Sequence, residues 1–175
     1  MGEIQDQLYG KVTGDMDVFK KIASKVPGFS GYIERQSRRD SDKLLRQMLA
    51  DRFRELEKKV SSLQRDFIAS GDLKYVDDLE ASALKLRTFS DRVRTASRGY
   101  SGLFDAVKIN EEELALLYGY DASMLDQAEE IDHAIDNVAA SVGTDGLPAA
   151  LRDLNTRTED CIEIFNRRDE VVFAK

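Results

Sequence analysis

Two residues in the second half of the chain have the types and the spacing of a metal site. Glu130 and His133 form the pattern Glu-x-x-His, which metal-binding helical bundles use to hold an ion on one helix. Such ligands project into the bundle core, whereas the apolar spacing here turns Ala128, Ile131 and Ile135 inward. We therefore expect Glu130 and His133 to face water. His133 is the only histidine, so a second copy of the motif could come only from a dimer.

Nucleophilic chemistry has one candidate, Cys161. A single cysteine excludes an intrachain disulfide and a cysteine-based zinc site. Because Cys161 falls on the apolar spacing of the last expected helix, we expect a small buried hydrophobic residue rather than a reactive thiolate. Asp121 also falls on an apolar spacing, and three interpretations stay open: a shift of register, a position at the bundle end near Tyr120, or a functional buried carboxylate. We predict no catalytic residue, no cofactor and no enzyme.

Residues 26–47, with the sequence VPGFSGYIERQSRRDSDKLLRQ, combine a Pro-Gly corner with two aromatic and five basic side chains. Arginines beside aromatic rings can bind phosphates or an anionic lipid surface. The candidate interaction surface consists of Phe29, Tyr32, Arg35, Arg38, Arg39, Lys43 and Arg46. The competing interpretation is a bundle corner whose arginines are neutralised by Glu111, Glu112 and Glu113. Nucleic acid fits less well, because the chain carries a formal net charge of −7.

Part of this stretch resembles other proteins. The run PGFSGYIERQSRRDSDKLLR, residues 27–46, is similar to a run in an uncharacterised family of all-helical bacterial proteins. The resemblance implies a bacterial helical protein of the cytoplasm. It assigns no role to any residue.

Composition favours a single all-α domain. The chain has 175 residues, 42% of them hydrophobic and 34% charged, with two prolines and no tryptophan. Long segments without turn residues favour helices over a β fold with many turns. We expect no membrane span and no signal peptide, because the chain has no sufficiently long apolar run and begins MGEIQDQ. The expected location is the cytoplasm.

The apolar residues recur at alternating steps of three and four, the spacing of helices that pack lengthwise. Leu49, Phe53, Leu56 and Val60 show it clearly. We predict a short helix over about 15–25 and four long helices over about 32–69, 73–107, 111–142 and 147–173. The predicted fold is an elongated antiparallel up-down bundle with a short N-terminal helix, forming one domain over residues 15–175. Residues 1–14 are expected to form a flexible tail.

Charge is divided unevenly along the chain. Residues 1–100 contain 20 Lys and Arg against 16 Asp and Glu, whereas residues 101–175 contain 6 against 17. If the two halves pack together, much of this field is neutralised internally. If they do not, the basic half is available to an anionic partner.

These observations support three hypotheses for function. The first is a non-enzymatic helical-bundle scaffold or adaptor that binds a protein partner or self-associates through exposed helix faces. The second is a peripheral protein that binds a membrane or another anionic surface through the corner defined above. The third is a ferritin-like metal-binding bundle that uses Glu130 and His133.

Overall fold

The computed structural model describes residues 17–29, 35–106 and 111–173, and these residues form helices and turns without a strand. A helical segment over residues 17–25 comes first. The long helices are α2 (Arg35–Ser70), α3 (Val76–Ala106), α4 (Glu111–Ala140) and α5 (Leu147–Phe173), and a 3₁₀ turn, η1 (Leu73–Tyr75), precedes α3. The prediction of an all-α bundle with four long helices and a short N-terminal helix is confirmed. The predicted tail, residues 1–14, lies outside the described residues.

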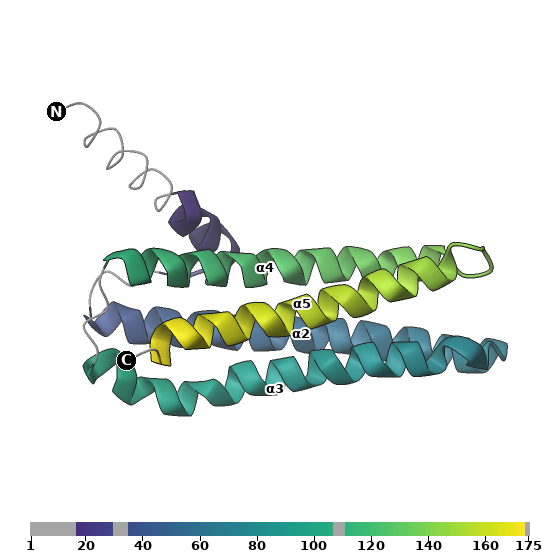
Figure 1. The fold of residues 1–175 in the computed structure, drawn as a ribbon, viewed down its shortest axis with the longest axis horizontal. Coiled ribbons are helices and arrows are strands. Elements are labelled where there is room, and N and C mark those ends of the chain that lie inside the picture. Colours follow the sequence, from purple (N-terminus) through teal and green to yellow (C-terminus); the bar gives the residue numbers. More distant parts are fainter. Residues whose placement is uncertain (1–16, 30–34, 107–110, 174–175) are drawn as a thin grey trace.

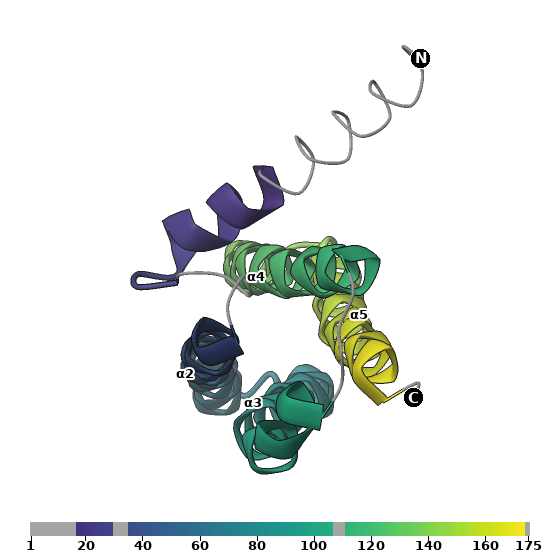
Figure 2. The same cartoon turned by 90° about the vertical axis from the view of Figure 1, so that its left-hand side faces the viewer.

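The bundle consists of two antiparallel hairpins. Figure 1 shows α2 and α3 joined by a tight turn at one end and α4 and α5 joined at that same end. Viewed along the bundle, the four helices surround a common core in the order α2, α3, α5, α4 (Figure 2). The N-terminal helical segment lies outside this ring, against α4.

The turn between α2 and α3 follows from the sequence ASGDL. Gly71 has a φ of 81°, in the left-handed region that glycine adopts without steric cost. The N–H of Gly71 donates to the Ile68 carbonyl at 3.1 Å, and the N–H of Asp72 donates to the Phe67 carbonyl at 3.0 Å. This pair of bonds is a Schellman motif, which satisfies the last carbonyls of a helix. Asp72 makes no side-chain cap bond, and α3 begins later than the predicted residue 73, after η1.

The core is built from the predicted apolar spacing. Leu49, Phe53, Leu56 and Val60 are fully buried along α2. The ring centroids of Phe53 and Phe89 lie 4.3 Å apart, so α2 and α3 meet there. Burial of a large apolar side chain stabilises the fold by about 1.5 to 3 kcal/mol. Packing of these stripes therefore holds the long helices together.

The N-terminal segment covers one face of α4 near the Pro-Gly corner. Phe29 is buried, and its ring centroid lies 5.9 Å from that of Phe19 and 6.3 Å from that of Tyr118. Lys25 forms an ion pair with Asp126 of α4 at 3.2 Å. The corner is thus docked on the bundle through both apolar and charged contacts.

Ion pairs connect the basic first half of the chain to the acidic second half. Arg52 Nη2 donates to Asp132 Oδ2 at 2.7 Å, and Lys59 forms a second pair with the same carboxylate. Lys85 of α3 pairs with Glu159 of α5. Of the two alternatives, the described helices show the first, because the two halves pack together and ion pairs connect them. No described helix contains an apolar stretch long enough to cross a bilayer.

Candidate functional site

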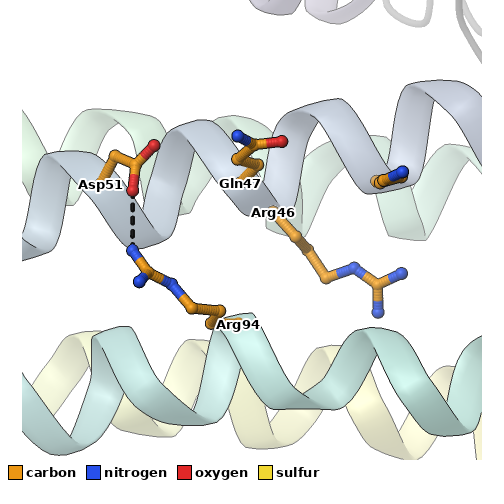
Figure 3. A pocket seen from close by; sticks show the side chains of 5 residues that line it. Arg46, Gln47, Asp51 and Arg94 are labelled. Atoms are coloured by element: carbon orange, nitrogen blue, oxygen red, sulfur yellow. Dashed lines mark hydrogen bonds and ion pairs between the residues drawn. The ribbon is translucent and has the colours of Figure 1, made fainter.

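The structure separates the members of the predicted interaction surface. Phe29 and Arg46 are buried, so the prediction that they are exposed is wrong for these two residues. Phe29 is covered by the N-terminal segment, and Arg46 points between α2 and α3 (Figure 3). Lys43 is exposed on α2, as predicted. Residue Tyr32 and the side chains of Arg35, Arg38 and Arg39 lie outside the described residues.

Neutralisation of the arginines by glutamates at the start of α4 was the competing interpretation. The side chains of Glu111, Glu112 and Glu113 also lie outside the described residues. Among the described residues, Arg46 has a partner on its own helix, because its Nη2 donates to Asp42 Oδ2. Asp42 is therefore an anion that balances Arg46.

A pocket of about 330 Å³ lies between α2 and α3 and retains two of the predicted surface residues (Figure 3). It is lined by Lys43, Arg46, Gln47, Asp51 and Arg94. Lys43, Gln47 and Asp51 follow one another at steps of four, which places them on the same face of α2. Arg94 reaches across from α3. The lining thus contains three cationic side chains and one carboxylate.

The two arginines of the pocket differ in burial. The Arg94 side chain is 58% exposed, and its Nη2 donates to Asp51 Oδ1 at 2.7 Å across the two helices. The Arg46 side chain is 6% exposed and is held by a buried carboxylate. Arg94 can therefore move with little cost, whereas the position of Arg46 is fixed by its surroundings.

Behind Arg46 the core contains a buried charge network to which the described residues contribute four side chains from three helices. Its members are Asp42, Arg46, Asp121 and Arg168. Arg168 of α5 donates from Nη2 to Asp42 at 2.9 Å and from Nε to Asp121 of α4 at 2.6 Å. Asp42 and Arg168 are each 1% exposed, and Asp121 is 0% exposed. Two carboxylates and two guanidinium groups balance in formal charge, which is what burial of ionised groups requires.

The network settles the position of Asp121, which the sequence left open. Asp121 lies on the inward face of α4 in the register that the apolar spacing predicts, and Arg168 binds it. Sequence reasoning missed Arg168, although it stands three residues after the buried Phe165 and therefore continues the apolar spacing of α5. Asp42 stands seven residues before Leu49 and continues the spacing of α2 in the same way. Charged residues of opposite sign on the inward faces of different helices were the available signal.

The Glu-x-x-His pattern lies on the outer surface, as predicted. Glu130 and His133 are both exposed. Glu130 pairs with Arg157 of α5, whose Nε also donates to Asp153 at 2.9 Å. No group of three potential metal ligands occurs among the residues that the structure describes. The pattern here contributes to contacts between α4 and α5.

Cys161 is buried in the core. Burial and, to a smaller degree, the charge of Asp160 raise the pKa of its thiol well above the usual range. A thiol in this environment stays protonated at neutral pH, and the thiolate is the nucleophilic form. The buried position that the sequence predicted for Cys161 is confirmed.

Two carboxylates between helices have lowered pKa values. Partial burial opposes ionisation of Glu57, but the hydrogen bond and charge of Arg87 outweigh it, so the pKa of Glu57 lies below its usual value. The pKa of Asp132 is also lowered, because Lys59 and Arg52 together outweigh the effect of its partial burial. Both groups are therefore ionised at neutral pH and act as acceptors for cations of neighbouring elements.

Comparison of the chain with protein-family models, curated proteins and solved structures found no match.

Proposed function

We propose that the protein is a non-enzymatic helical-bundle scaffold or adaptor of the cytoplasm that self-associates through exposed parts of its helices. The observation that carries the proposal is that ion pairs connect neighbouring helices of the bundle. Ion pairs link α2 to α3, α2 to α4, α3 to α5 and α4 to α5, so charged side chains hold neighbouring helices in place. Helices held in this way keep their outer faces in a constant arrangement relative to one another.

Three carboxylates in the ion pairs of the bundle have pKa values that favour their ionised form. The pKa values of Glu57, Asp126 and Asp132 are lowered: in each case partial burial raises the pKa, but cations outweigh it. A carboxylate that acts as a general acid or base works best with a pKa raised towards the working pH. The pKa values of these three carboxylates are shifted in the opposite direction. The raised pKa of the Cys161 thiol, caused mainly by burial, likewise disfavours nucleophilic chemistry. These shifts favour a binding role.

One end of the bundle exposes large apolar side chains. We define the apolar tip as Ile68, Leu73 and Val142, each about half exposed or more. Ile68 and Leu73 flank the turn after α2, and Val142 lies in the turn after α4, at the same end of the bundle (Figure 1). Apolar patches left in water are typical of interaction sites. An apolar patch also suits a symmetric dimer, in which the same surface meets its own copy.

Size-exclusion chromatography with light scattering at tens of micromolar protein tests the proposal. We expect a mass of two or more chains. The double variant Ile68→Gln, Leu73→Gln should shift the protein towards the monomer, because each glutamine adds a polar group that must be desolvated in the interface. Leu84→Gln changes an exposed leucine about two turns into α3, outside the apolar tip. This variant is the matched control and should leave the mass unchanged. A wild-type protein that stays strictly monomeric would contradict self-association.

A further inference from the structure

We infer that the pocket between α2 and α3 is a binding site for the phosphate group of a phosphate-bearing ligand. The inference is separate from self-association, because the pocket lies towards the end of the bundle opposite the apolar tip. Lys43, Arg46 and Arg94 approach the hollow from two helices, and Asp51 is the one carboxylate among the described residues that line it. The pocket therefore has an excess of positive charge within a protein that is acidic overall.

The types of the basic residues fit a phosphate. A guanidinium group presents N–H donors in a plane and matches the oxygens of a phosphate, and lysine adds a compact charge. Gln47 lines the same pocket and can donate through its side-chain amide. The pocket thus offers charge and directed hydrogen bonds together (Figure 3).

Arg46 is positioned before any ligand arrives. Its bond to Asp42 and the bond of Asp42 to Arg168 fix it in the core. A side chain that is already ordered loses little entropy on binding. Arg46 Nη2 holds Asp42, and its Nε and Nη1 are buried, so Arg46 contributes its positive charge to the pocket floor rather than direct hydrogen bonds from these two atoms.

Asp51 accepts a hydrogen bond from Arg94, as an oxygen atom of a bound phosphate would. The side chains of both Arg94 and Asp51 are exposed, and exposed ion pairs contribute little to stability. A phosphate entering the pocket can replace Asp51 as the acceptor of Arg94 at small cost. Asp51 also repels an anion, so its neutralisation should strengthen binding.

The size of the pocket indicates a ligand larger than phosphate alone. Its volume of about 330 Å³ falls at the lower end of the range of small-molecule sites, about 300 to 1,000 Å³. A phosphate monoester on a small organic group fits this description. The same chemistry occurs in the headgroup of an anionic lipid, and the experiment has to separate the two sources.

Isothermal titration of the full-length protein with pyrophosphate at low salt tests the site. We expect saturable binding at one site per chain that weakens as salt is added. The double variant Lys43→Gln, Arg94→Gln changes only exposed residues and should weaken binding about tenfold or more, because two charge-assisted hydrogen bonds are lost. Asp51→Asn should strengthen binding several-fold. The double variant Lys58→Gln, Arg65→Gln removes two exposed charges elsewhere on α2 and should bind as the wild type does.

A second arm uses sedimentation with phosphatidylcholine vesicles, with and without phosphatidic acid. Binding of pyrophosphate with this order of variants supports a soluble phosphate-bearing ligand. Binding only to vesicles that contain phosphatidic acid, with the same order of variants, supports a lipid phosphate. Absence of binding in both arms would overturn the inference. So would an equal loss in the Lys43, Arg94 variant and in the Lys58, Arg65 control.

Discussion

The two ends of the bundle core are built from different chemistry. Towards the end that carries both turns, the interior is apolar and is formed by side chains such as Leu56, Leu79, Val138 and Leu151. Towards the other end, the buried charge network stands among apolar neighbours. The same spacing of three and four residues produces both ends, so the spacing alone does not decide whether the interior is apolar or charged.

This difference indicates that the apolar side chains of the core provide stability, whereas the buried charge network sets the register of the helices. Apolar side chains lower the free energy of the folded state in proportion to the area that they bury, and they tolerate exchange for others of similar volume. Buried ion pairs gain little net stability, because desolvation offsets the attraction. Arg168 nevertheless has partners on two other helices, Asp42 of α2 and Asp121 of α4. A shift of α5 by one turn would break both bonds, so we infer that the network fixes the register of the hairpins.

The largest effect is expected from breaking the network at its centre. Arg168→Met leaves Asp42 and Asp121 buried without this cation, and we expect a loss of about 3 to 5 kcal/mol in the free energy of unfolding. Urea unfolding followed by circular dichroism measures it. The matched control is Arg167→Met, because Arg167 is exposed and pairs only with Glu163 on its own helix among the contacts described. A loss below 1 kcal/mol for Arg168→Met would show that the network is not energetically coupled.

Truncation at the apolar end sharpens the comparison. Leu151→Ala removes a buried side chain from α5 and should cost about 2 to 5 kcal/mol through lost burial and the cavity that remains. Urea unfolding should show an unchanged slope, because the register and the exposed area on unfolding stay the same. Leu84→Ala, at an exposed position of α3, should change stability by less than about 0.5 kcal/mol. Equal losses at the two positions would contradict the described core.

The smallest effect concerns the partly exposed ion pairs. Lys59 and Arg52 lower the pKa of Asp132 against the effect of its partial burial, so the pair contributes stability above the unfolded pKa of about 4 and loses it as pH falls through the folded pKa. Because the groups are partly in water, Asp132→Asn should cost less than about 1 kcal/mol at pH 7. The difference from wild type should shrink below pH 4 in thermal unfolding. Asp136→Asn, an exposed neighbour on α4, is the control and should change stability at pH 7 by less than about 0.5 kcal/mol.

The sequence predicted the elements well because their signals are local. The apolar spacing within each segment placed the four helices. The N-terminal segment showed the limit of this reasoning. Phe29 was predicted to be exposed, but its ring packs against those of Phe19 and Tyr118. Because Tyr118 lies on a helix far along the chain, the local sequence does not reveal this contact.

The candidate site was predictable only in part. Lys43 and Arg46 were identified from their charge, but the spacing within α2 does not reveal that Arg94 of α3 lies opposite. Arg168 was missed because a charged residue on an apolar spacing can be identified as part of a buried ion pair only when its partner on another helix is known. Partners across helices depend on register, which a single sequence does not specify.

The most direct test of the central claim is carbodiimide cross-linking of a variant whose buried charge network is replaced by apolar residues. The changes are Asp42→Leu, Arg46→Met, Asp121→Leu and Arg168→Met. The wild type should give the links Lys59 to Asp132 and Lys85 to Glu159, which match its ion pairs.

We expect this variant to unfold no more easily than the wild type, or to resist unfolding by about 1 to 4 kcal/mol more. We also expect additional links one helical turn away, such as Lys59 to Glu129, because the register is no longer fixed. A variant that is less stable and keeps only the wild-type links would contradict the claim that the network sets register rather than stability.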